Sequence, residues 1–206
     1  MARVRPSPTS AVVALAAELR AAGRSIISLG AGEPDFPTPR HIREAGKKAI
    51  DDGKYFAYPP VAGYQDLREA IASKYQKDNN VPYKAENIVV SNGAKHSIAN
   101  IFMALINPGD EVIVYAPYWV SYVELIKLAE GVPVIIEGTL EQEFKAPVEA
   151  LKKAITPKTK AIIYSSPSNP TGSVFTKQEL QEIADVVPLT AQSIYIVGRK
   201  IGLTRL

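Results

Sequence analysis

The 206-residue chain has 46% hydrophobic and 22% charged residues, a balance typical of a globular protein that buries a core. Its net charge of +3 is small and its lysines are scattered, which argues against a nucleic-acid partner. Because there is no cysteine and the only histidines are His41 and His96, the composition excludes disulfides, thiolate chemistry and a histidine metal cluster.

The N-terminal segment combines two arginines with an apolar patch at residues 11–17. The patch is short for a signal peptide and continues into Glu18 and Arg20, so an amphipathic helix is the better interpretation. No stretch approaches the ~20 apolar residues that a membrane span needs. We therefore expect a cytoplasmic protein with no membrane partner.

Helices and strands are expected to alternate along the chain. Thr38, as N-cap, and Pro39 predict the start of a helix that runs to about Asp51, and residues 64–77 form an amphipathic stripe. Extended apolar runs predict strands near residues 88–91, 111–115, 132–136 and 161–164. Further helices are expected from about Ala94, after Trp119, and after the capping box of Thr176 and Glu179.

This alternation predicts an α/β fold with a mainly parallel sheet covered by helices on both faces. The segment after Val187 departs from the pattern. It has a proline, a strand-like run at residues 194–197 and a basic end, with no helix to balance that strand and nothing afterwards that would complete a sheet.

Unusual residues follow three of the expected strands, in "SNGAK", "APYW" and "SSPSNPTG". Parallel sheets bind ligands at the carboxyl ends of their strands, so these segments are candidates for one site. Each segment alone has an ordinary interpretation. The helix start at Gly93 could bind an anion or be a simple turn, and Trp119 could stack on a flat ligand or fill a gap. The acidic pair Glu33 and Asp35 fits a surface turn better than a metal site.

The motifs taken together resemble the class I and II aminotransferases, which are pyridoxal-phosphate enzymes with the aspartate aminotransferase fold. The matching segments are "GEPDF" followed by "TP", the frame Y-x-P-x-x-G-x-x-x-L-R from Tyr58 to Arg68, "SNGAK", "PGDEV", "PYWVSY" and "NPTG". The similarity covers about residues 10–187 and looks closest to the bacterial and plastidic aspartate aminotransferases.

The resemblance implies a set of cofactor contacts. Asn169 would bond to the phenolic oxygen of the pyridoxal ring, with a cis peptide bond to Pro170, and Trp119 would stack on that ring. Gly93, Ala94 and Lys95 would present a helix start to the phosphate, and Tyr58 would reach the phosphate of a neighbouring subunit's cofactor. Gly32, Trp119 and Asn169 would contact the substrate, an amino acid or a 2-oxo acid, and the complete protein would be a homodimer.

The family's catalytic lysine, which forms a Schiff base with the cofactor, has no counterpart in this sequence. Relatives place it in a Ser-x-x-Lys or Ser-Lys segment beyond an Asp-x-x-Tyr segment that pairs with the ring nitrogen. Lys200 lacks that context, and Asp185 lies within an expected helix rather than after a strand. A catalytic residue is therefore not assigned.

The sequence thus predicts the N-terminal part of an aminotransferase, with an incomplete large domain. Residues 1–45 would form the N-terminal arm and a small-domain segment, residues 46–187 a partial large domain, and residues 188–206 a divergent tail. Two alternatives remain open. One is a non-catalytic relative with the same fold, and the other is an unrelated nucleotide-binding domain, for which no G-x-G-x-x-G fingerprint is found.

Overall fold

The computed structural model describes residues 4–30, 32, 34–187, 195–197 and 204–205. The chain divides into two compact units. Residues 1–15 and 93–206 form one, which we call the sheet unit, and residues 16–92 form the other, the helical unit. Helix α1 (Pro8–Ala21) runs through the boundary at residue 15. The expected N-terminal helix is therefore present, and Val12 and Leu15 on it are exposed.

The sheet unit is built on a five-stranded sheet with the order β2-β1-β3-β4-β5. Its strands are β1 (Glu111–Ala116), β2 (Val132–Glu137), β3 (Thr159–Ile163), β4 (Tyr195–Val197) and β5 (Thr204–Arg205). The pairs β1–β2, β1–β3 and β3–β4 are parallel, and only β4–β5 is antiparallel. The predicted α/β fold with a mainly parallel sheet is confirmed.

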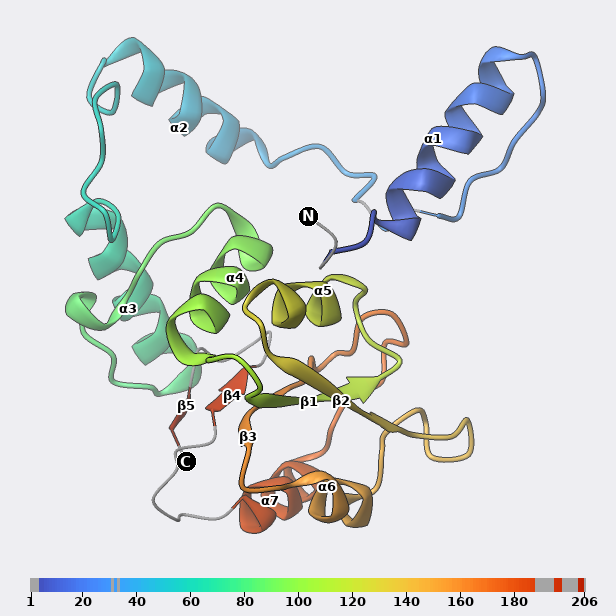
Figure 1. Ribbon diagram of the computed structural model, residues 1–206. Coiled ribbons are helices and arrows are strands. Elements are labelled where there is room, and N and C mark those ends of the chain that lie inside the picture. The colour runs from blue at the N-terminus through green and yellow to red at the C-terminus, as the bar shows by residue number, and fades with distance from the viewer. Residues whose placement is uncertain (1–3, 31, 33, 188–194, 198–203, 206) are drawn as a thin grey trace. The chain divides into compact units, whose positions relative to one another are not determined.

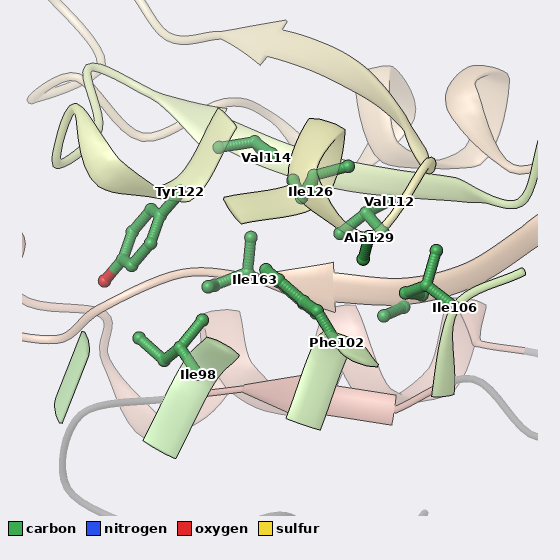
Figure 2. Packing of buried hydrophobic residues seen from close by; sticks show 10 residues of the cluster. Ile98, Phe102, Ile106, Val112, Val114, Tyr122, Ile126, Ala129 and Ile163 are labelled. Atoms are coloured by element: carbon green, nitrogen blue, oxygen red, sulfur yellow. The ribbon is translucent and has the colours of Figure 1, made fainter. Parts of the chain in front are cut away.

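Helices cover both faces of this sheet (Figure 1). Helices α4 (Gly93–Leu105) and α5 (Ser121–Leu128) pack on one face, and α6 (Val148–Ala154) and α7 (Lys177–Val186) pack on the other. Phe102 of α4, Ile126 of α5 and Ile163 of β3 meet in the first core layer (Figure 2). Alternate residues of a strand point to opposite faces, so Val112 and Val114 join this layer while Ile113 and Tyr115 join the second.

Two expectations about the sheet are wrong. Residues 88–91 form no strand, because no described segment pairs with them in a ladder. The Val90 N–H donates to the Ala62 carbonyl at 3.0 Å, and the Ile88 N–H donates to the nearby Ala85 carbonyl at 3.1 Å. The tail, by contrast, does extend the sheet, since β4 runs parallel to β3 and β5 follows it. Hydrogen bonds to a neighbouring strand stabilise a short strand even where its own sequence pattern is weak. A local sequence pattern cannot show whether such a neighbour is present.

The helical unit contains α2 (Arg40–Asp51), α3 (Gln65–Asn79) and a short 3₁₀ helix, η1 (Ala85–Asn87). Helix α2 begins two residues after the predicted cap, with Pro39 rather than Thr38 as its N-cap residue. The capping box of α7 is confirmed: the Glu179 N–H donates to Thr176 Oγ1 at 3.2 Å, and the Thr176 N–H donates to Glu179 Oε2 at 2.6 Å. Helix α6 was not anticipated from the sequence. None of the described helices is both long and apolar enough to cross a membrane.

Candidate functional site

Two of the predicted site segments follow strands whose carboxyl ends lie at the same end of the sheet. Strands β1 and β3 are parallel neighbours, with Val114 beside Ile163. The segment Pro117–Trp119 follows the end of β1, and the segment that carries Asn169 follows the end of β3. The predicted clustering at the carboxyl ends of the strands therefore holds for these two segments.

The "SSPSNPTG" segment folds into a turn that bonds to itself. The Ser168 N–H donates to the Ser173 carbonyl at 2.8 Å, and the Gly172 N–H donates to the Ser168 carbonyl at 2.9 Å. Ser165 Oγ accepts a bond from the Asn169 N–H at 3.1 Å. The Asn169–Pro170 peptide is cis, as the resemblance implied. The serines thus supply acceptors for backbone groups that a strand would otherwise pair.

Within this turn the Asn169 residue is exposed, whereas Ser165 beneath it is buried with 6% of its surface accessible. The turn places an asparagine amide at the surface of the site on a backbone held by buried groups. That arrangement suits a ligand contact, because the amide can both donate and accept.

The third predicted segment forms the N-terminus of α4. Gly93 has φ of +82°, which a glycine adopts without strain, and Gly93, Ala94 and Lys95 are all exposed. The first N–H groups of a helix have no intrahelical partner and carry a partial positive charge. Lys95 adds a full charge beside them, so this helix start can bind an anion.

Trp119 connects the helix start to the end of β1. The Lys95 ammonium lies 5.2 Å from the centre of the Trp119 ring, within the range of a cation–π contact. The indole also packs edge-on against Tyr122, with ring centres 5.6 Å apart and an angle of 89° between the planes. Trp119 is only partly buried, which leaves part of the indole accessible.

A small cavity joins the two strand-end segments. Tyr118 from the first and Ser165, Ser168 and Asn169 from the second all line it. Tyr115 and Lys145 line the same cavity. These two residues belong to no motif, so sequence reasoning missed them.

Lys145 is held by two carboxylates. Its ammonium lies 2.9 Å from Glu143 Oε2 and 2.7 Å from Glu179 Oε1. The hydrogen bonds to Glu143 and then Glu179 raise the pKa of Lys145, and the bond from Lys145, reinforced by the Thr176 N–H, lowers the pKa of Glu179. The Lys145–Glu179 ion pair connects the loop before α6 to the start of α7. Nothing local in the sequence signals it.

The remaining predicted residues lie elsewhere. Tyr58 and Gly32 belong to the helical unit and are exposed, and their approach to the cofactor contacts stays a prediction. Glu33 and Lys200 lie outside the described residues. Asp185 lies within α7, where it accepts a bond from Gln181 Nε2 at 2.8 Å, in agreement with its exclusion as a ring partner. Within the described residues, no group of three or more His, Cys, Asp or Glu side chains could hold a metal ion.

Comparison with known proteins decides the family. Residues 24–196 match the family model described as aminotransferase class I and II. The chain belongs to this family. The aminotransferase match ends within β4, so it includes part of the segment beyond Val187.

Individual relatives agree with the family. The chain is 53% identical over 184 residues to a probable aspartate/prephenate aminotransferase of Rickettsia bellii, covering 89% of this chain and 46% of that protein. It is 46% identical over 201 residues to the aspartate aminotransferase of Geobacillus stearothermophilus, covering 98% and 50%. The chain thus spans about half the length of the curated aminotransferases it matches.

Solved structures show the same likeness. The aspartate aminotransferase of Thermus thermophilus with maleate superposes with a TM-score of 0.90 at 43% identity, over 96% of this chain and 52% of that one. The aspartate aminotransferase from Rhizobium meliloti gives a TM-score of 0.90 at 34% identity, over 98% and 50%. The incomplete aspartate aminotransferase-like fold predicted from the sequence is therefore confirmed.

Proposed function

We propose that this chain forms the cofactor-binding part of a pyridoxal-phosphate-dependent aminotransferase of the aspartate aminotransferase type. The observation that carries the proposal is the meeting of the "PYW" and "NPTG" segments at one cavity on the carboxyl edge of the sheet. Family membership supplies the chemistry: transfer of an amino group between an amino acid and a 2-oxo acid.

The residues at this edge fit pyridoxal 5′-phosphate. A phosphate needs positive charge and N–H donors, which the N-terminus of α4 and Lys95 provide. A flat ring needs an aromatic face, which the partly accessible Trp119 provides. The exposed Asn169 amide can donate to a phenolic oxygen. When bound, the cofactor supplies an electron sink for the substrate's amino carbon.

The chain's own residues then have binding and orienting roles. Lys95 and the α4 N–H groups would bind the phosphate, Trp119 would stack on the ring, and Asn169 would bond to its phenolic oxygen. Gly32, Trp119 and Asn169 would also contact the substrate.

We further propose that the complete enzyme is a homodimer in which Tyr58 reaches the cofactor phosphate of the other subunit. Tyr58 is fully exposed in the isolated chain, as expected for a side chain whose partner is on another molecule. Light scattering combined with size-exclusion chromatography measures the oligomeric state. A monodisperse monomer of the complete protein would contradict this part of the proposal.

The binding role is tested with pyridoxamine 5′-phosphate, which lacks the aldehyde and so cannot react with surface lysines. Trp119 is the only tryptophan, so its fluorescence reports directly on a ring stacked against it. We expect saturable quenching, weakened by Asn169→Ala and unchanged by Asn100→Ala, an exposed position on α4. Quenching that Asn169→Ala leaves unaltered would place the ligand elsewhere.

A second candidate function is cofactor binding without catalysis. It is favoured by the lack of a Ser-x-x-Lys or Ser-Lys segment among residues 173–206, because relatives place their lysine after "NPTG"; the pair Ser73-Lys74 comes before it. The chain, supplied with pyridoxal phosphate, aspartate and a 2-oxo acid, is expected to form no oxo acid above a protein-free control. Turnover abolished by Lys200→Ala would instead assign Lys200 as the catalytic lysine, and turnover that survives the substitution would assign another residue.

A further inference from the structure

The Tyr115 hydroxyl is a buried polar group without a partner. Tyr115 lies on β1 and only 6% of its surface is exposed. Its Oη atom is fully buried and has no hydrogen bond to any residue that the structure describes. Burial, and to a lesser extent the neighbouring Tyr164, raises the pKa of Tyr115, so the hydroxyl keeps its proton at any ordinary pH. A buried hydroxyl left unpaired costs about 1–3 kcal/mol, which makes a missing partner informative.

Tyr115 cannot readily turn its hydroxyl to solvent. Its ring packs edge-on against Tyr164 and Phe175, with ring centres 6.1 Å and 5.7 Å away. Those two rings also contact each other at 5.4 Å, so the three aromatic side chains form a closed cluster. A partner must therefore come to the hydroxyl.

The cavity described above offers space for such a partner. All three rings line it, together with Ser165, Ser168, Asn169 and Ser173. The space open to the centre of a water-sized sphere is about 10 Å³. A cavity of roughly this size holds a single water molecule when polar groups line it.

The serines that line the cavity differ in the bonding capacity that they keep for a water molecule. Ser165 Oγ accepts one bond, from the Asn169 N–H, and so retains its proton and a second lone pair. Ser173 Oγ donates to the Glu143 carbonyl at 2.6 Å and accepts a bond from Thr171 Oγ1 at 3.1 Å, so its proton is already used and only one lone pair remains. Ser165 is therefore the better second partner.

We propose that one ordered water occupies this cavity. The water accepts a hydrogen bond from the Tyr115 hydroxyl and forms a second hydrogen bond with Ser165 Oγ. Because Ser165 Oγ also accepts a bond from the Asn169 N–H, the water stabilises the turn that carries Asn169. Tyr115 is then a positioning residue for Asn169, although it lies in the second core layer. This inference concerns the fold of the turn and does not depend on cofactor binding.

The test compares Tyr115→Phe with Tyr164→Phe in the full chain. Each removes one hydroxyl from the same aromatic cluster, but Tyr164 is only partly buried. Hydrogen exchange at the Asn169 and Phe175 amides reports on the turn, since these N–H groups donate to Ser165 Oγ and Ser166 Oγ. We expect exchange there to be about five- to tenfold faster in Tyr115→Phe, with the Val114 amide of β1 unchanged. Tyr164→Phe should leave all of these rates unchanged.

Urea unfolding followed by Trp119 fluorescence gives a second reading. Tyr115→Phe should lower the folding equilibrium constant of the sheet unit about fivefold. An unchanged or higher stability, or exchange rates equal to those of Tyr164→Phe, would mean that the cavity is dry or that bulk water reaches the hydroxyl. Either result overturns the proposal, as would a crystal structure without water density at hydrogen-bond distance from Tyr115 Oη.

Discussion

The ammonium of Lys95 lies 5.2 Å from the centre of the Trp119 ring. The two residues come from different motifs, one at the start of α4 and one after β1. Their contact brings a positive charge and an aromatic face to one place, which is the combination that a phosphorylated aromatic ligand requires.

Replacement of Lys95 by Gln should weaken binding of pyridoxamine 5′-phosphate roughly five- to tenfold, because a charged hydrogen bond to phosphate is lost. The affinity of the variant should also depend less on salt. Trp119 fluorescence titrations at two salt concentrations measure both effects. Lys153→Gln, an exposed position on α6, is the matched control and should bind normally. Equal affinities of the two variants would rule Lys95 out as a phosphate contact.

The Lys145–Glu179 pair should make the stability of the sheet unit depend on pH. The hydrogen bond from Lys145 lowers the pKa of Glu179 below its ordinary value of 4.5. A lowered folded-state pKa stabilises the fold above the unfolded-state value, and this contribution is lost as the pH falls through the folded-state pKa. We therefore expect the urea midpoint to decrease as the pH falls below about 4.5, with a smaller decrease in Glu179→Gln.

Glu182→Gln is the control for this experiment, because Glu182 lies one turn further along α7 and its carboxylate accepts a bond from Gln178 Nε2 at 3.1 Å, with no ion pair to a residue that the structure describes. Its pH dependence should follow that of the unaltered chain. If Glu179→Gln and Glu182→Gln behave alike, the ion pair contributes nothing to acid stability.

Gly63 should not tolerate a side chain. Its φ is +96°, and an added Cβ would lie 2.7 Å from Val90 Cγ2. Gly63→Ala should therefore destabilise the helical unit by more than about 1 kcal/mol. Gly46→Ala is the opposite control, because Gly46 lies in helix α2 with nothing within 4 Å of the added atom. That change should stabilise by about 0.5–1 kcal/mol. Thermal unfolding followed by circular dichroism distinguishes the two, and equal melting temperatures would refute the strain at Gly63.

Arg68 should stabilise the segment that leads to Gly93. Its Nη2 and Nε donate to the Ala85 carbonyl at 2.7 and 3.0 Å, and Nε also donates to the Ile88 carbonyl at 3.1 Å. Arg68→Ala removes the guanidinium bonds from both part-buried carbonyls, although the Ala85 carbonyl keeps its bond from the Ile88 N–H, and should cost about 1.5–3 kcal/mol locally. Hydrogen exchange over residues 85–90 should increase, whereas Arg43→Ala, at an exposed position of α2, should leave it unchanged. Protection that survives Arg68→Ala would show that other contacts hold this segment.

The boundaries expected at residues 45 and 187 remain predictions. The two compact units divide the chain at residues 15 and 92 instead, but they are defined by contacts within one chain. The boundaries expected from the sequence refer to domains of a longer protein.

The sequence by itself determined the features that depend on neighbours along the chain. Apolar runs rich in β-branched residues predicted β1, β2 and β3. The reason holds for β1 and β3, which are buried on both faces and need apolar side chains throughout, whereas β2 lies at the edge of the sheet and is largely exposed. Thr176 and Glu179 predicted the start of α7, because a capping box bonds only within one turn. The "NPTG" and "PYW" motifs predicted the edge of the sheet on which Asn169 and Trp119 lie.

The tertiary structure alone decided the features that depend on distant segments. Residues 88–91 look like a strand but have no ladder partner among the described residues, while β4 is a strand because β3 lies beside it. Lys145 pairs with Glu179, and Tyr115 and Ser165 line one cavity, only after the strands and helices have packed. Pairing and burial are properties of the packed fold, so no local pattern could assign these residues to the site.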